Sequence, residues 1–161
     1  MARRVRSAFA VAVAVVSMLV LGVAVMAADS NVGTWKLNLA KSKFSPGPAP
    51  KSQTLKVEAW GADGVKFTAD GVDAEGKPAH WELQAKYDGK FVPFTGNPDA
   101  DMLAYKRIDA NRVEATTQLK GKPAQTTKIV VSADGKTRTL TQTGKNAKGQ
   151  TVKNVVVYDK Q

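Results

Sequence analysis

Ten short runs in which apolar and polar residues tend to alternate are the feature that most constrains the fold of this chain. Alternation at every second residue is typical of a β-strand, and after residue 27 no segment sustains the apolar period of a helix. We therefore predict an all-β fold. The predicted strands lie at residues 34–39, 52–59, 65–69, 79–87, 90–94, 102–108, 112–119, 126–131, 137–142 and 151–158.

The sequences between these runs are short and rich in turn-forming residues. Asp88-Gly89 and Asp134-Gly135 suit the positive φ angles of tight hairpins, and Gly121-Lys122-Pro123 is predicted as another turn. Hairpins join sequential neighbours, and pairing of the last strand with the first removes exposed edges. We therefore predict a single up-and-down antiparallel β-barrel of about ten strands. The longer segments 40–50 and 95–100 are predicted as rim loops.

One pattern occurs twice along the chain. It spans a strand and two hairpin turns, and it pairs residues 53–57, 62–64 and 71–76 with residues 125–129, 133–135 and 144–149. A duplication and the recurrence of the same turn chemistry both explain the match. Either explanation favours regular hairpins.

Residues 1–27 have the pattern of a secretory signal peptide, which we expect to be helical. Arg3, Arg4 and Arg6 precede an uncharged run that ends with small residues, so cleavage is expected after Ala27, with Ala28 the next best site. The predicted domains are thus a signal peptide at 1–27 and a barrel at 28–161. An uncleaved anchor is the alternative, because the run approaches the ~20 residues that span a bilayer. We expect export to the periplasm or the medium.

The mature chain is basic, but its charges are dispersed. Lys and Arg number 24 against 14 Asp and Glu, and loss of the three leader arginines lowers the net charge from +10 to +7. The lysines stand singly in strand-like runs, whereas a nucleic-acid site clusters them with aromatic residues. We therefore expect no nucleic-acid binding and only weak contact with an anionic envelope surface. Since cysteine is absent, an apolar core must stabilise the domain.

Gly33-Thr34-Trp35 on the first strand, with Tyr158-Asp159-Lys160 on the last, resembles the calycin superfamily, which includes the lipocalins and the fatty-acid-binding proteins. The stretch 41–48 is also similar to small exported lipocalin-like bacterial proteins of unassigned function. The resemblance implies that Gly33 and Trp35 form a structural plug at one end of the barrel. It further implies a cation, Lys153 or Arg138, over the Trp35 ring.

The chain departs from the fatty-acid-binding pattern in two places. Residues 40–50 are short and proline-rich, which excludes the helix-turn-helix lid of those proteins. Their Arg-x-Tyr on the last strand corresponds here to Val156-Val157-Tyr158, so the tyrosine is present and the arginine is absent. Arg138, on the preceding strand, is the local substitute.

No catalytic or metal-binding constellation is apparent. His80 shares a strand face with Glu82 and Lys86, opposite an apolar face, so we expect it to point outward. Asn97 to Asp101 begins like a calcium-binding EF-hand loop, but Met102 occupies the glycine position, and an Asx turn is the preferred interpretation. We predict neither an enzyme nor a cofactor nor a metal site.

The remaining candidate site is the barrel interior. The predicted inward residues are Trp35, Leu37, Leu55, Val57, Val65, Phe67, Trp81, Leu83, Tyr87, Val113, Ile129, Leu140 and Val156. Many of their companions are small, which is compatible with a modest cavity and equally with a tightly filled core. The sequence leaves these alternatives open.

Two functional hypotheses follow for what we expect to be a monomer. In the first, the interior binds a small hydrophobic or amphipathic ligand. The proposed contacts are aromatic walls at Phe67, Trp81 and Tyr105 and a polar anchor at Arg138 or Tyr158. In the second, a ligand-free module binds an envelope protein, a polysaccharide or an anionic surface through its basic exterior.

Overall fold

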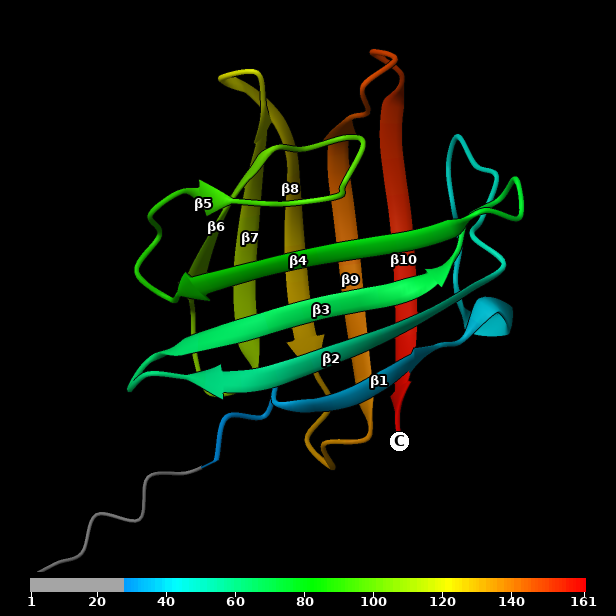
Figure 1. Cartoon of the computed structure of the whole chain (residues 1–161). Coiled ribbons are helices and arrows are strands. Elements are labelled where there is room, and N and C mark those ends of the chain that lie inside the picture. The colour runs from blue at the N-terminus through cyan, green and yellow to red at the C-terminus, as the bar shows by residue number, and fades with distance from the viewer. Residues whose placement is uncertain (1–27) are drawn as a thin grey trace, which may run out of the picture.

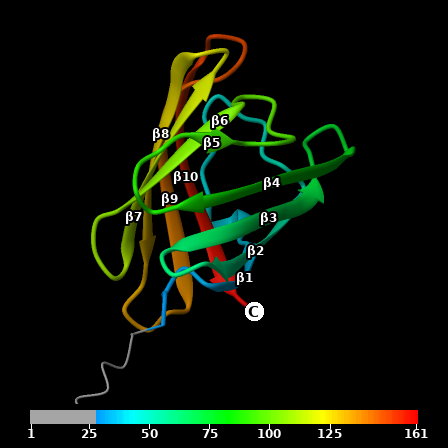
Figure 2. The same ribbon diagram turned by 60° about the vertical axis from the view of Figure 1, so that its left-hand side comes forward.

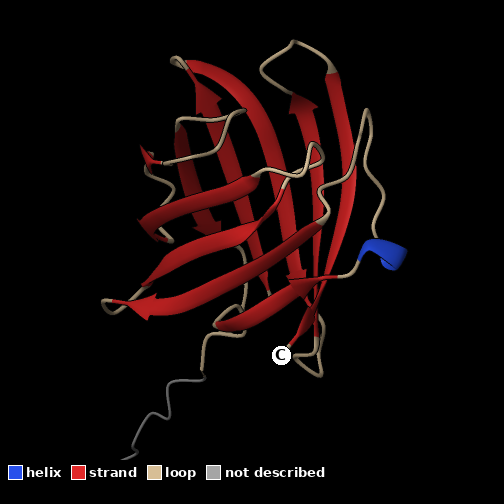
Figure 3. Ribbon diagram, turned by 45° about the vertical axis from the view of Figure 1, so that its right-hand side comes forward, coloured by secondary structure: helices blue, strands red, loops and turns tan. Residues whose placement is uncertain are grey.

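A computed structural model describes residues 28–161, so the predicted signal peptide lies outside the described residues. The described chain is all-β, with one 3-10 turn, η1 (Leu39–Lys41) (Figure 3). The strands are β1 (Gly33–Leu37), β2 (Ser52–Trp60), β3 (Gly64–Val72), β4 (Pro78–Lys86), β5 (Val92–Pro93), β6 (Met102–Arg107), β7 (Arg112–Leu119), β8 (Lys122–Val131), β9 (Thr137–Lys145) and β10 (Thr151–Lys160). Among residues 28–161, no helix has the length and apolar character needed to cross a bilayer.

The ten strands form one antiparallel sheet that curls into a nearly closed barrel. Their order is β4-β3-β2-β1-β10-β9-β8-β7-β6-β5. The first strand pairs with the last, as predicted, and Trp35 lies opposite Lys160. In Figure 1, β1 to β4 cross the front of the barrel and β6 to β10 stand upright behind them, and Figure 2 shows the same two layers from the side.

The barrel is fastened along a seam between β4 and β5. The backbones of Glu82 and Thr95 exchange two hydrogen bonds across it, of 3.1 and 3.0 Å. At the other end of the seam, the amide of Gly89 donates to the carbonyl of Tyr105 on β6 over 2.8 Å. These few bonds replace a continuous ladder, because β5 itself contains only two residues.

All ten predicted strands are present, but only β7 has the predicted bounds, and the prediction departs most instructively from the structure at β5 and β8. The prediction at 90–94 was too long, because only Val92 and Pro93 pair with β6. The predicted turn at Gly121-Lys122-Pro123 was wrong, because Lys120 and Gly121 have the positive φ angles, 51° and 75°, and β8 begins at Lys122. Pro123 is tolerated inside β8 because it lies beside a register shift in the pairing with β7.

The repeated sequence pattern corresponds to two hairpins of the same construction. In the β3–β4 turn, the Asp73 side chain accepts a hydrogen bond from the Lys77 amide over 2.7 Å. In the β9–β10 turn, the Asn146 side chain accepts from the Gln150 amide over 2.9 Å. The repetition therefore extends to the turn chemistry, in which an Asx residue caps each loop.

Gly144 on β9 lies where neighbouring strands approach each other closely, beside one of these hairpins. Its φ is +140°, and an added Cβ would lie 2.2 Å from the carbonyl oxygen of Ala124. We expect Gly144→Ala to lower the free energy of unfolding by about 3 kcal/mol, through backbone strain and overpacking. The matched control is Gly149→Ala, where φ is +76° and nothing lies within 4 Å of the added Cβ. It should lose only about 1 kcal/mol. Equal losses in urea unfolding would contradict the steric argument.

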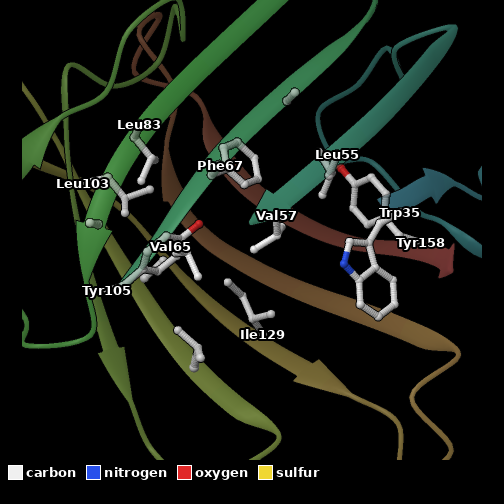
Figure 4. Close-up of a cluster of buried hydrophobic side chains, with 14 of the residues drawn as sticks. Trp35, Leu55, Val57, Val65, Phe67, Leu83, Leu103, Tyr105, Ile129 and Tyr158 are labelled. Carbon is white, nitrogen blue, oxygen red and sulfur yellow. The ribbon is translucent and has the colours of Figure 1, made fainter. Parts of the chain in front are cut away.

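The core side chains point into the space between the two layers of strands (Figure 4). All thirteen residues predicted to face inward belong to it. Ten are buried, and the half-buried Trp81, Tyr87 and Leu140 pack against them. The inward face was predictable because the side-chain period of a strand puts alternate residues on the same side.

Candidate functional site

A cavity of about 400 Å³ lies inside the barrel, and several core side chains line it. It reaches the rim, where the proline-rich loop supplies Phe44 and Pro46 and the hairpin turns supply Asp73 and Asn146. The volume falls within the range of about 300 to 1,000 Å³ that is usual for ligand pockets. Of the two alternatives left open by the sequence, the structure has the cavity.

One wall of the cavity is aromatic. The Phe94 ring lies 6.5 Å from that of Phe67 and 6.3 Å from that of Trp81, both with edge-to-face geometry. Sequence reasoning missed Phe94, although it ended a predicted strand, because the short β5 disturbs the alternation there. These three rings give the cavity a surface suited to an apolar ligand body.

The opposite wall, on β8, β9 and β10, is layered along the barrel axis. Strand register aligns inward side chains in cross-strand rows. Below the outermost row, which contains Gln125, Gly144 and Val152, the first row is polar, the next is apolar, and the deepest contains a cation and a phenol. In that order, the cavity-lining members of the rows are Thr127, Gln142 and Asn154, then Ile129, Leu140 and Val156, then Arg138 and Tyr158.

Arg138 is the most unusual member of this wall. Its side chain is only 3% exposed, and its Nε and Nη1 atoms are buried without a hydrogen-bond partner among the described residues. Burial raises the pKa of both Tyr105 and Tyr158, although the charge of Arg138 opposes the shift, so both phenols are neutral at physiological pH. The hydroxyl of Tyr158 donates to Oε1 of Gln53. Unused guanidinium donors thus remain at the deep end of the cavity.

The structure brings all five predicted ligand-binding residues to this cavity. Phe67, Trp81, Tyr105, Arg138 and Tyr158 each line it. Their role in binding remains a prediction. Sequence reasoning did not select the polar row at the rim, because its members lie in runs with weak apolar alternation.

The predicted plug residues lie at the other end of the barrel. Trp35 is fully buried, and its indole Nε1 donates to the carbonyl of Asn31 over 2.9 Å. The cation near the ring is Lys160, whose Nζ lies 5.1 Å from the ring centroid, so the prediction of Lys153 or Arg138 was wrong. The β1–β10 register places Lys160 directly opposite Trp35.

Gly33 makes room for this arrangement. Its φ is +144°, and an added Cβ would lie 2.7 Å from Cε of Lys160. The glycine of the Gly33-Thr34-Trp35 motif therefore allows the lysine stem to lie across the end of the barrel. The plug role of Gly33 and Trp35 itself stays a prediction.

The segment before β1 is tied to the same end by Asp29. One carboxylate oxygen of Asp29 accepts hydrogen bonds from the Tyr87 hydroxyl and from Nη2 of Arg107, each over 2.7 Å. The Arg107 guanidinium lies 3.9 Å from the centroid of the Tyr87 ring. Sequence reasoning did not single out this cluster, because its members are far apart in the chain.

Replacing Asp29 with asparagine is expected to cost about 2 kcal/mol of stability at neutral pH. Burial raises the pKa of Asp29, but hydrogen bonds from Arg107, Tyr87 and Asn31 outweigh it and hold that pKa below its usual range. A carboxyl group whose pKa is lower in the folded than in the unfolded protein stabilises the fold at pH values above its unfolded-state pKa of 3.8. This stabilisation is lost as the pH falls through the folded-state pKa. As the pH is lowered from neutral, the free energy of unfolding measured in urea should therefore decline less in Asp29→Asn than in the wild type. The control is Asp63→Asn at an exposed position, whose free energy of unfolding should depend on pH as that of the wild type does. If the curve for Asp29→Asn also runs parallel to that of the wild type, the stabilising role assigned to the Asp29 carboxylate is contradicted.

His80 and the loop at Asn97 were the other candidate positions. His80 points outward as predicted, with Nδ1 2.7 Å from Oδ1 of Asp70, which raises the pKa of the histidine. The Asn97 side chain accepts from the amide of Asp99 over 2.8 Å, as an Asx turn requires. Asp99 in turn accepts from the amide of Ala147. Within residues 28–161, no group of His, Asp or Glu side chains is arranged to hold a metal ion.

No protein-family model matches this sequence, and no curated protein does. Among solved structures, the fluorescent protein UnaG and a mutant of it superimpose with a TM-score of 0.54 at 14% identity, over 82% of this chain and 98% and 96% of theirs. A zebrafish ileal bile acid-binding protein complexed with cholic acid gives a TM-score of 0.48 at 13% identity, over 82% of this chain and 99% of that one. The fold is a calycin-like β-barrel, as the sequence resemblance implied.

Proposed function

We propose that this chain binds one small amphipathic ligand inside its barrel, with an apolar body against the aromatic wall and an acid group at Arg138. The observation that carries the proposal is the pair of unpartnered guanidinium atoms, Nε and Nη1, in a side chain that is 3% exposed and lines the cavity. A buried charge whose donors are unsatisfied is costly, and an acid group would remove that cost. Arginine presents its donors in a planar fork that matches a carboxylate.

The surroundings of Arg138 favour the same ligand class. Tyr105 and Tyr158 are buried beside it and carry no charge that could repel an anion. Phe67, Trp81 and Phe94 supply apolar surface across the cavity. The ligand is thus expected to combine an apolar body with one anionic end.

The test compares dodecanoic acid with dodecanol, which has the same chain without the acid. Calorimetric titration should show the acid binding at least tenfold more tightly, as expected for a charge-assisted hydrogen bond. Native mass spectrometry of the protein isolated from its own cells should also detect an acidic adduct. Equal affinities would refute the anchoring role of Arg138. Failure of both compounds to bind, with no adduct, would refute the proposal and favour the surface interaction module.

We also propose that the barrel acts outside the cytoplasm, as a monomer, after loss of residues 1–27. The contacts of Asp29 with Tyr87 and Arg107 support the cleavage site, because they begin two residues after it and would survive cleavage. The mass of the protein from a periplasmic or medium fraction should correspond to a start at Ala28 or Asp29. An uncleaved mass in the membrane fraction would contradict the proposal.

A further inference from the structure

The polar row at the rim of the cavity presents a specific hydrogen-bond donor. The backbone amide of Ser45, in the proline-rich loop, donates to the side chain of Asn154 over 2.9 Å. A backbone N–H can only donate, so the Asn154 atom that faces it is the oxygen Oδ1. The amide group of Asn154 therefore directs its nitrogen, Nδ2, toward Gln142.

This orientation determines that of the next side chain. Nδ2 of Asn154 donates to Oε1 of Gln142 over 3.1 Å. The amide nitrogen of Gln142, Nε2, is then left with two N–H donors. Nε2 makes no hydrogen bond to another residue of the described chain, and Gln142 lines the cavity.

The distance between this donor row and the deep cation follows from the strand geometry. Arg138 and Gln142 both face inward on β9, with Leu140 between them. Four residues at about 3.3 Å each separate the two rows by roughly 13 Å along the strand. The row between them is apolar and faces the aromatic wall. The cavity wall is thus polar at both ends and apolar in the middle.

We propose that the ligand is polar at both ends. An acid group lies at Arg138, and a hydroxyl or carbonyl oxygen at the other end accepts a hydrogen bond from Nε2 of Gln142. This inference rests on the proposed function and deepens it by naming the ligand class. A simple alkyl acid would make no hydrogen bond with the half-buried Gln142 donor, whereas a chain with an oxygen at its far end would accept one.

The experiment compares dodecanoic acid with ω-hydroxydodecanoic acid by calorimetric titration. We expect the wild type to bind the hydroxy acid about fivefold more tightly, the effect of one additional neutral hydrogen bond. In Gln142→Met, which keeps the length of the side chain and removes the donor, the ratio of the two affinities should fall to about one or below. Gln142→Leu, a second variant whose side chain has neither a donor nor an acceptor, should give the same loss of preference.

The matched control is Gln84→Met, because Gln84 lies exposed on the outer face of β4. It should keep the fivefold preference. Equal binding of the two acids to the wild type would overturn this inference and leave the proposed function standing, and a preference that survives in both Gln142 variants would also overturn it. Failure of the wild type to bind either acid would overturn both proposals.

Discussion

Replacing Arg138 with methionine is expected to stabilise the ligand-free protein by about 1 to 3 kcal/mol and to weaken dodecanoic acid binding about a hundredfold. The guanidinium is buried with Nε and Nη1 unpartnered, so its removal abolishes a desolvation cost that no hydrogen bond at these two atoms offsets. Methionine occupies similar space with an apolar, flexible side chain. The same change removes the only cation that we assign to the ligand's acid group. Stability and affinity should therefore move in opposite directions.

Urea unfolding and calorimetric titration of the purified variant measure the two effects. The matched control is Arg112→Met, whose side chain is 60% exposed on the outside of the barrel. It should change stability by no more than about 0.5 kcal/mol and leave binding unaffected. A less stable Arg138→Met variant would show that the guanidinium supports the empty fold, which would contradict its assignment to a ligand.

Replacing Trp35 with alanine is expected to lower the free energy of unfolding by about 4 kcal/mol. The indole is 0% exposed, so its loss leaves a large cavity at the closed end of the barrel. It also removes the hydrogen bond to the carbonyl of Asn31 and the contact with the Lys160 ammonium group. A loss of this size is a large fraction of the stability of a typical domain.

Urea unfolding followed by circular dichroism gives the measurement. Trp60→Ala is the control, because Trp60 is 40% exposed at the end of β2 and should cost about 1 kcal/mol. If Trp35→Ala does not fold, Trp35→Phe keeps most of the apolar volume and should cost about 2 kcal/mol. A loss below 1 kcal/mol in Trp35→Phe and no greater loss in Trp35→Ala than in Trp60→Ala would contradict the plug role.

The parts of the fold that sequence predicted best are those determined by local chemistry. Strand alternation identified the inward face, including Leu55 and Phe67, because burial of one face requires a period of two. The turn at Lys120 was misplaced because its first residue is a lysine with positive φ, which no local signal marks. β5 was predicted too long because its length depends on where the sheet closes, which is a property of the whole barrel.

The sequence predicted which residues line the site, but it did not predict how they are arranged. Arg138 was selected because it lies on the strand before the last, as the local substitute for the arginine that the last strand lacks, but its unpartnered donors become visible only when the surrounding strands are in place. The cation over Trp35 was misassigned because its identity depends on the β1–β10 register. The orientation of Gln142 depends on a chain of contacts that begins at the Ser45 amide. Interactions between residues far apart in sequence therefore account for most of what was missed.

The pairing of β1 with β10 also has a consequence for the order in which the molecule can be assembled. β10 leaves the ribosome after the other nine strands, yet it lies in the middle of the sheet, between β1 and β9. Until it arrives, β1 and β9 have unsatisfied edges, and only the few hydrogen bonds of the β4–β5 seam can join the two halves of the sheet. The pairing of β1 with β10 requires contacts between residues distant in sequence, which form slowly. A nascent chain of this topology stays open until its synthesis is almost complete. That delay would suit the export that we propose, because a chain that threads through a secretion channel must do so before it folds.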